Sequence, residues 1–309
     1  MSKRKQGKAC ASKCCGKPPI TLVKMDDTYT ILNGERMDLA AIIKRTGART
    51  KKDIPENILM QLNAGEIECA NVVEWSAVNR KCLLENVLKQ HDRTDYLRPV
   101  LEHVDNLEKQ TVNTVGEAIG AGLLHQMKIH GDDGFLQILL TFQSDLVRAW
   151  GAFIIGKDTA LTLEQMLENI KPFAADRHFN VREEAWTAVR PAVMQSLNES
   201  IMILSKWVTD ADENIRRFAS EVTRPRGVWC QHIEVLKQTP AIALPILEPL
   251  KSDTSKYVRD SVGNWLNDAS KTQPLFVEAL CNQWEKDSPT DETKYIIKKA
   301  MRTMNKKST

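Results

Sequence analysis

Carboxylates and arginines recur together in the second half of the sequence. They stand 1, 5, 8 or 9 residues after an arginine that itself recurs, and in a helix these four positions lie on neighbouring ridges. The acidic members of the set are Glu183, Glu221 and Asp268. The basic and amide members are Arg190, Arg217, Arg224 and Asn264. If the helices stack side by side, these side chains form one surface of mixed charge.

A surface of mixed charge fits a ligand that carries both signs of charge. A groove for DNA alone should be lined by Lys and Arg, because phosphates supply most of the affinity and carboxylates repel them. An N-alkylated base is cationic, and so is the sugar when its glycosidic bond breaks. A fixed carboxylate beside that developing charge lowers the barrier, and its removal typically costs about 3–4 kcal/mol. The same carboxylate can orient the attacking water. The plain alternative is a set of exposed ion pairs, each worth under about 1 kcal/mol.

Two tryptophans and one loop add candidate contacts. Trp186 and Trp229 lie close to the charged positions, and a tryptophan can pack on a cationic base or on a sugar, although in a helical hairpin it can equally belong to the core. The dipeptide after Arg224 ends in Arg226, and this stretch follows a helix end. A loop at that place is suited to a phosphate contact.

The elements that must position these residues come from an internal repeat. Four segments align on Arg148, Arg182, Arg216 and Arg259, at spacings of 34, 34 and 43 residues. Each opens with polar residues, then has Val or Ile, the arginine and an apolar helical pattern. This repeat predicts an all-α fold, an α-solenoid of HEAT-like helical hairpins. We interpret the four arginines as an architectural ladder between repeats, and expect Asp145, Asn180 and Asp212 to cap the helix starts.

The order of the chain predicts three parts. Residues 1–20 are basic and rich in small residues, which is typical of a disordered tail. Residues 21–53 form an N-terminal extension with a strand-like piece at 29–32, a turn and a short helix. Residues 54–306 are the repeat domain, and its first helix begins at Pro55. The tail has a CxxxCC cluster, but no second pair of ligands follows at metal-binding spacing, so no metal is expected.

Composition bounds the class of protein. The net charge of +3 and 42% hydrophobic residues are ordinary for a globular chain, and no segment reaches the roughly 18–20 apolar residues of a membrane helix. The start leads into no apolar stretch typical of a secretory signal. Seven scattered cysteines favour reduced thiols. We therefore expect a cytoplasmic protein, nuclear if the source is eukaryotic, that is a monomer and does not bind membranes.

Several long motifs resemble a known family. NVREEAWTAVRP, IRRFASEVTRPRGVW and DTSKYVRDSVGNWLNDASKTQP are similar to segments of the HEAT-like-repeat DNA glycosylases of the AlkC/AlkD superfamily, and look closest to the AlkC branch. The resemblance covers residues 54–306. It departs at Val222, where the pattern has Gly, and at 227–229, where Gly-Val-Trp stands for Leu-Pro-Trp.

The resemblance implies a concave DNA-binding surface and an enzyme, a DNA N-glycosylase of the hydrolase class. Its substrate is duplex DNA with alkylated bases such as 3-methyladenine or 3-methylcytosine, which the family is thought to release without flipping the base into a pocket. It needs no metal or organic cofactor. The acidic residues in the matching motifs are Glu183, Glu221 and Asp268, with Glu183 the first choice as the main catalytic group and Glu184 an alternative.

Two other functions fit the same fold. One is a HEAT-repeat protein that binds DNA structures without catalysis, with affinity that falls as salt rises. The other is a protein–protein scaffold, which should expose a mainly apolar patch. The mixture of Glu, Arg and Asn argues against the scaffold.

Overall fold

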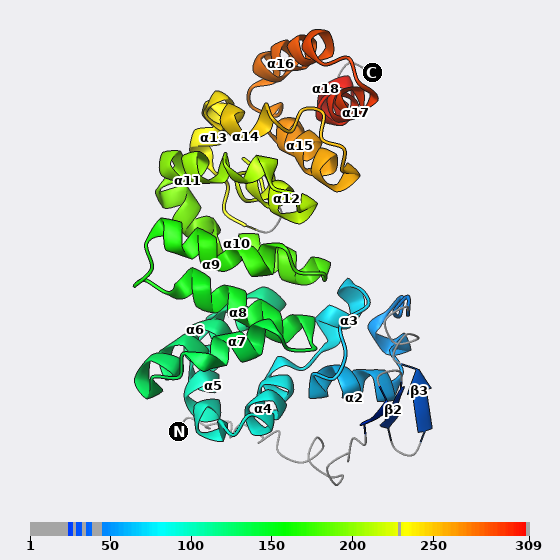
Figure 1. The fold of residues 1–309 in the computed structure, drawn as a ribbon, viewed down its shortest axis with the longest axis vertical. Coiled ribbons are helices and arrows are strands. Elements are labelled where there is room, and N and C mark those ends of the chain that lie inside the picture. The colour runs from blue at the N-terminus through cyan, green and yellow to red at the C-terminus, as the bar shows by residue number, and fades with distance from the viewer. Residues whose placement is uncertain (1–23, 27–28, 33–34, 39–44, 228–229, 307–309) are drawn as a thin grey trace, which may run out of the picture. The chain divides into compact units, whose positions relative to one another are not determined.

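A computed structural model describes the chain over residues 45–227 and 230–306, and the backbone of three strands at 24–26, 29–32 and 35–38. Contacts divide the chain into two units, Met1–Leu97 and Arg98–Thr309. Figure 1 shows their elements in sequence colours. The predicted tail and its CxxxCC cluster lie outside the described residues. The predicted domain limits at 20/21 and 53/54 stay predictions. The boundary between the two units follows Leu97, inside the predicted repeat domain.

The first unit contains a small antiparallel sheet. Its strands are β1 (Lys24–Asp26), β2 (Tyr29–Leu32) and β3 (Glu35–Asp38), in the order β1-β2-β3. The register of β2 and β3 sets Tyr29 opposite Asp38 and Leu32 opposite Glu35. The strand-like piece predicted at 29–32 is therefore present, with two further strands, while the predicted Asn33-Gly34 turn lies outside the described residues.

The helices of the first unit begin and end at recognisable residues. Pro55 is the N-cap of α2, as predicted, and Gly65 ends that helix in the left-handed region at φ 78°, where an L side chain is strained. A single 3₁₀ turn, η1, precedes it, and the short helix predicted for the extension stays a prediction. The elements are η1 (Lys51–Asp53), α2 (Glu56–Ala64), α3 (Val72–Ala77), α4 (Arg80–Gln90) and η2 (Thr94–Tyr96).

The second unit is helix after helix over its described residues. Its elements are α5 (Leu97–Asp105, whose first residue closes the first unit), α6 (Val112–His130), α7 (Gly134–Leu140), α8 (Asp145–Lys157), α9 (Leu163–Ala174), α10 (Phe179–Gln195), α11 (Leu197–Leu204), η3 (Trp207–Thr209), α12 (Glu213–Val222), α13 (Glu234–Gln238), η4 (Pro240–Ala243), α14 (Leu244–Leu247), α15 (Lys256–Ala269), α16 (Pro274–Asp287), α17 (Asp291–Ala300) and α18 (Arg302–Asn305). The four repeated arginines lie in α8, α10, α12 and α15. These helices pack on one another in that order, followed by α17 (Figure 1).

The caps at the start of the repeated helices are partly as predicted. Asp212 is the N-cap of α12 and accepts a hydrogen bond from the backbone N–H of Asn214. Asp145 and Asn180 do not cap, which corrects the expectation for them. Instead, Nδ2 of Asn180 donates to Oδ2 of Asp145 at 3.0 Å, a buried link between α8 and α10. His178 caps α10 in its place.

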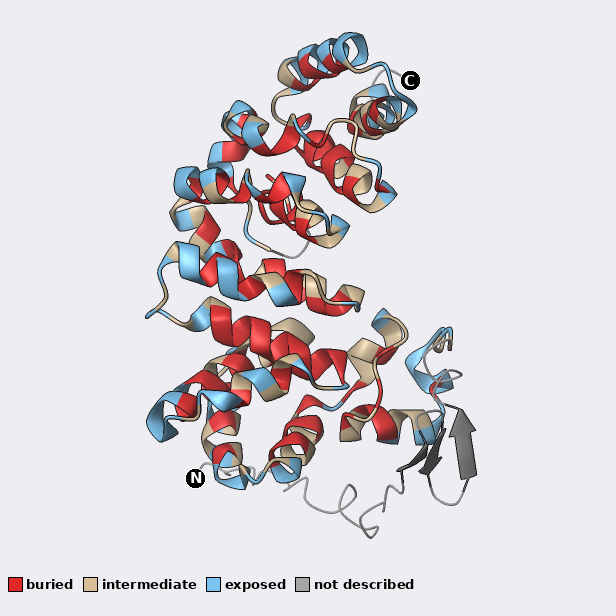
Figure 2. Ribbon diagram, in the orientation of Figure 1, coloured by how far each residue is buried: buried red, intermediate tan, exposed pale blue. Residues whose placement is uncertain are grey.

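The core lies where the repeated helices face their neighbours. The stripe at offsets −1, +3 and +6 from each arginine is buried, for example Val181, Ala185 and Ala188 of α10 (Figure 2). Close packing of α8 on α10 needs Gly156, because a Cβ there would stand 2.3 Å from the carbonyl oxygen of Ala188. The predicted helical period is thus the one that packs. None of the described helices has the length and apolar character to cross a membrane.

Candidate active site and nucleic-acid interface

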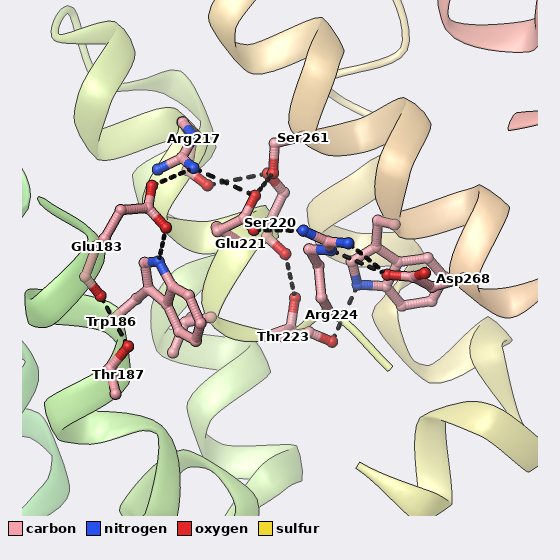
Figure 3. A network of polar contacts seen from close by, with 12 residues as sticks. Glu183, Trp186, Thr187, Arg217, Ser220, Glu221, Thr223, Arg224, Ser261 and Asp268 are labelled. Carbon is pink, nitrogen blue, oxygen red and sulfur yellow. Dashed lines mark hydrogen bonds and ion pairs between the residues drawn. The ribbon is translucent and has the colours of Figure 1, made fainter. Parts of the chain in front are cut away.

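Glu183 of α10 presents a carboxylate whose two oxygens are both held by hydrogen bonds. Oε1 accepts from Nη2 of Arg217 at 2.6 Å, and Oε2 accepts from the indole Nε1 of Trp186 at 2.8 Å (Figure 3). Trp186 lies one helical turn further on, so the helix itself sets this second contact. The Glu183 side chain keeps 39% of its surface exposed. It is a carboxylate in a fixed orientation that a ligand can reach.

Arg217, in the middle of α12, joins two carboxylates. Besides Glu183, its Nη2 lies 3.6 Å from Oε2 of Glu221. Its guanidinium also stacks on the ring of Tyr257, 4.2 Å from the ring centre. Burial alone would lower the pKa of Arg217, but Glu221 and Glu183 raise it above its usual value. Arg217 therefore stays cationic and fixes the position of Glu183.

Glu221 lies inside the protein, only 5% exposed. Its Oε1 accepts from Nη1 of Arg224 at 2.7 Å, and its Oε2 accepts from the Ser261 hydroxyl at 2.7 Å. Desolvation opposes its charge, yet Arg217 and Arg224 outweigh burial and hold the pKa of Glu221 below its usual value. It is an ionised, fully paired group that links α12 to α15.

Arg224 and Asp268 close the network at the next repeat. Nε and Nη2 of Arg224 both donate to Oδ2 of Asp268, at 3.0 and 2.7 Å. The other oxygen of Asp268 accepts from Nζ of Lys271 at 2.9 Å. Burial would lower the pKa of Arg224, but its two carboxylate partners raise it. Asp268 itself is 3% exposed, so a ligand cannot reach it without displacing its partners.

The three predicted carboxylates are therefore brought into one network but do not occupy equal places in it. Acids and bases alternate from Glu183 through Arg217, Glu221, Arg224 and Asp268 to Lys271. Figure 3 shows the part of this chain of contacts from Glu183 to Asp268, which crosses from α10 to α15. Of the three carboxylates, only Glu183 is substantially exposed. The alternative, Glu184, is buried at 8% exposure. The arrangement can present one carboxylate in a fixed place while the rest keep the arginines charged and aligned.

Arg190 occupies a different environment from the one expected of a phosphate ligand. It is 2% exposed, and its guanidinium donates to three main-chain carbonyls. These are Val222 and Arg224, each at 2.7 Å, and Gln231, at 3.1 Å. Burial lowers the pKa of Arg190, partly offset by Cys230 nearby. Because its hydrogen bonds tie α10 to the end of α12 and to the stretch that follows, we leave it out of the proposed interface.

Of the remaining predicted residues that the structure describes, only Trp186 makes a hydrogen bond with the network. Asn264 and Arg226 are half-buried, and Nε of Arg226 is buried without a hydrogen-bond partner among the described residues. Trp186 is 6% exposed, so it serves Glu183 through its N–H edge more than it offers a free face. Trp229 lies outside the described residues. Over that same described part of the chain, no three metal-binding side chains come together.

Tyr257 is a functional candidate that the sequence patterns did not single out. It stands two residues before the repeated Arg259, where the other repeats have Leu146, Asn180 and Asn214. An aromatic residue at a position otherwise held by Leu or Asn was the available signal. Its ring lies under Arg217, at the centre of the site.

Comparisons with known proteins agree on the fold. No protein-family model matches the chain. An uncharacterized protein of Bacillus subtilis strain 168, YhaZ, is 41% identical over 140 residues, which is 45% of this chain and 38% of YhaZ. The chain thus spans well under half of that relative.

Two solved structures share the architecture. The alkylpurine DNA glycosylase AlkC of Pseudomonas fluorescens, bound to DNA containing an abasic site analog, matches with a TM-score of 0.57 and 20% identity over 84% of this chain and 66% of that one. AlkD2 of Streptococcus mutans matches with a TM-score of 0.50 and 21% identity, over 69% of this chain and 97% of AlkD2. The predicted helical architecture of AlkC/AlkD type is thereby confirmed.

Proposed function

We propose that this chain, which has the fold of AlkC and AlkD2, is a DNA glycosylase. It hydrolyses the N-glycosidic bond of cationic alkylated bases, of the 3-methyladenine or 3-methylcytosine type, in duplex DNA. The observation that carries the proposal is Glu183, whose carboxylate is exposed at 39% while Arg217 and Trp186 hold both of its oxygens. A carboxylate so held suits a positive charge that develops at a fixed point.

The hydrolysis requires few protein groups besides this carboxylate. As the bond between C1′ and the base nitrogen lengthens, its electron pair moves to the cationic base, which leaves neutral and needs no proton. The sugar becomes an oxocarbenium-like cation, and the carboxylate of Glu183 stabilises it electrostatically. A water molecule then adds to C1′ and gives its proton to Glu183. The products are the free methylated base and an abasic sugar.

The buried part of the network supports Glu183 in this role. Arg217 cannot turn away from Glu183 without leaving Glu221 and the Tyr257 ring. Glu221 is in turn held by Arg224 and Ser261. Because the partners are already oriented, no reorganisation is needed as charge develops, which is the condition for effective electrostatic stabilisation. We assign Glu221 and Asp268 to this positioning role.

The comparisons support the reaction class. AlkC is an alkylpurine DNA glycosylase solved with DNA that contains an abasic site analog, which resembles the product of such a reaction. The acidic and arginine residues of this chain lie on successive helices of the same fold.

The test is a base-release assay. Purified protein is incubated with methylated duplex DNA, and released bases are separated and identified. We expect release of 3-methyl bases by the wild type and none by Glu183→Gln. Glu234→Gln changes a carboxylate that is 67% exposed and paired with Lys237; it is the matched control and should retain release. Absence of release by the wild type, where a control glycosylase releases base, would overturn the proposal.

A second candidate is a DNA-structure binder without catalysis. The observation in its favour is that every carboxylate of the network already has a cation partner, as purely architectural groups would. It predicts salt-dependent binding to duplex DNA with no base released, so the same assay separates the two.

A further inference from the structure

The repeated arginines share one local contact. Each donates its Nη1 to the two main-chain carbonyls that lie five and six residues earlier, as Arg148 does to Phe142 and Gln143, each at 2.8 Å. Arg182, Arg216 and Arg259 make the same pair of bonds. This contact fixes the turn before each repeated helix, as expected of architectural residues.

Two of the arginines also pair with an aspartate of the next repeat. Nε of Arg148 donates to Asp176 at 2.7 Å, and Nε of Arg216 donates to Asp253 at 2.7 Å. Each aspartate lies six residues before the next repeated arginine, so the ion pair joins one repeat to the following one. These two ion pairs are the rungs that the repeat predicts, and they neutralise their arginines.

Arg182 departs from this pattern although the aspartate is available. Asp210 stands at the position equivalent to Asp176 and Asp253, and it accepts from the backbone N–H of Asp212 at 3.0 Å. Nε of Arg182 instead donates to the hydroxyl of Tyr257 at 3.3 Å, 75 residues along the chain. Among the described residues Arg182 has no carboxylate partner. Its Nη2 makes no hydrogen bond to them either.

Arg259 also has no carboxylate partner among the described residues, and its Nε is buried without a hydrogen-bond partner there. Arg259 lies 5.5 Å from the ring centre of Tyr295. It ends the series, whereas Arg182 is diverted from within it.

The hydrogen bond to Tyr257 places Arg182 at the candidate active site. Its guanidinium lies 5.2 Å from the Tyr257 ring centre, and Arg217 lies 4.2 Å from the same centre, so one phenol holds two cations. Arg182 also directly precedes Glu183 in α10. In the network, Arg217, Arg224 and Lys271 balance Glu183, Glu221 and Asp268 in charge. Arg182 is therefore a surplus positive charge beside the exposed carboxylate.

We propose that Arg182 binds a backbone phosphate of the DNA strand beside the nucleotide on which Glu183 acts, and that Tyr257 is its positioning residue. This inference rests on the proposed function for the identity of the ligand. Nη2 of Arg182 keeps its N–H donors available for a phosphate oxygen. Nε donates to the Tyr257 hydroxyl and Nη1 donates to two main-chain carbonyls, so the guanidinium is held in place while Nη2 stays available. Arg148 and Arg216 are each paired with an aspartate, so their positive charge is already neutralised.

The test compares Arg182→Gln with Arg216→Gln, a change at the same helical position whose guanidinium is neutralised by Asp253. Binding to methylated and unmethylated duplex DNA is measured over a range of salt concentrations. One lost phosphate contact lowers the slope of log K against log salt by about 0.9. We expect this loss in Arg182→Gln, on both DNAs, and the wild-type slope in Arg216→Gln. Arg182→Lys keeps the charge and should keep the slope.

Two Tyr257 variants test the positioning role. Tyr257→Phe removes the hydroxyl that accepts from Nε of Arg182 but keeps the ring under both arginines, so it should lose part of the salt slope, while Tyr257→Leu removes both contacts and should reproduce the Arg182→Gln slope. Thermal unfolding of each variant shows whether the fold is intact. An unchanged slope in a folded Arg182→Gln would overturn the inference.

The possible failures are distinguishable. If the wild type releases base but Arg182→Gln keeps the wild-type slope, only this inference fails. If Arg182→Gln shows the expected loss of slope but the wild type releases no base, the proposed function fails and the phosphate contact stands. If the wild type binds no DNA, both are overturned.

Discussion

The indole Nε1 of Trp186 donates a 2.8 Å hydrogen bond to Oε2 of Glu183, so this aromatic residue is bound to the carboxylate by its edge. A tryptophan in a DNA-contacting surface is usually expected to offer its ring face. Here the ring is buried at 6% exposure, and the N–H group carries the function. The relationship separates two roles for Trp186 that can be tested.

Trp186→Phe removes the N–H donor and keeps an aromatic ring. A hydrogen bond to a charged group is worth about 1.5–3 kcal/mol, so we expect single-turnover base release to fall by roughly 10- to 100-fold. DNA affinity should change little, because Glu183 and not the ring faces the ligand. A loss of DNA affinity with an unchanged rate would instead assign the ring face to substrate contact.

The buried carboxylate Glu221 should make stability depend on acid. Its pKa in the folded protein lies below the ordinary 4.5, because Arg217 and Arg224 outweigh desolvation. A depressed pKa contributes stability that is fully present above about pH 4.5 and is lost as pH falls through the folded-state pKa. We therefore expect Glu221→Gln, which breaks a buried pair, to cost about 3–5 kcal/mol at pH 7. Denaturant unfolding of both proteins from pH 7 to pH 3 should show the difference shrink; a constant difference would count against the pairing.

Arg190 should contribute to the stability of the fold and not to DNA binding. Its guanidinium donates to three main-chain carbonyls, at Val222, Arg224 and Gln231, and the bond to Val222 is fully buried. Because an unsatisfied buried acceptor costs about 1–3 kcal/mol, Arg190→Leu should lower the free energy of unfolding by at least that amount. Arg190→Lys replaces only part of the fork and should fall between. At a temperature where Arg190→Lys is folded, the salt dependence of DNA binding should equal that of the wild type, and a reduced slope would return Arg190 to the interface.

Gly156 should be sensitive to a single methyl group. A Cβ atom added at this residue would lie 2.3 Å from a backbone atom, the carbonyl oxygen of Ala188, so α8 and α10 must separate to admit alanine. Overpacking of this kind costs about 1–3 kcal/mol. Gly134→Ala at the start of α7 is the control, since nothing lies within 4 Å of the place its Cβ would take, and it should be neutral or slightly stabilising. Chemical denaturation compares the two, and equal midpoints would show that the helices yield without cost.

Sequence periodicity predicts the repeated part of the fold well. Offsets from the repeated arginine identify the buried stripe, including Val147, Val181 and Val258, all of which have no exposed surface. The rungs at Arg148 and Arg216 were also predictable, because each pairs with an aspartate that recurs with the repeat. Such features depend on contacts between adjacent repeats, which a fixed spacing encodes.

The candidate site was predicted as a set of residues but not as an arrangement. Offsets place Glu183, Glu221 and Asp268 on neighbouring ridges, yet the next helix covers the later positions and leaves only Glu183 substantially exposed. Whether an arginine faces outward or turns to main-chain carbonyls, as Arg190 does, depends on the stretch after α12 and not on its own helix. The contact of Arg182 with Tyr257 spans 75 residues, beyond the range of any local pattern.

That same contact changes how the stack should respond to force. In a stacked-repeat protein each repeat contacts only its neighbours, so the stack stretches and bends in small independent steps. The hydrogen bond between Arg182 of α10 and Tyr257 of α15 bypasses α12, so it connects the first and third of three successive repeated helices directly. The segment from α10 to α15 should therefore deform as a single stiff block while the ends remain compliant. Glu183 lies within that block, so bending of the flanking repeats around a curved ligand leaves its surroundings undistorted.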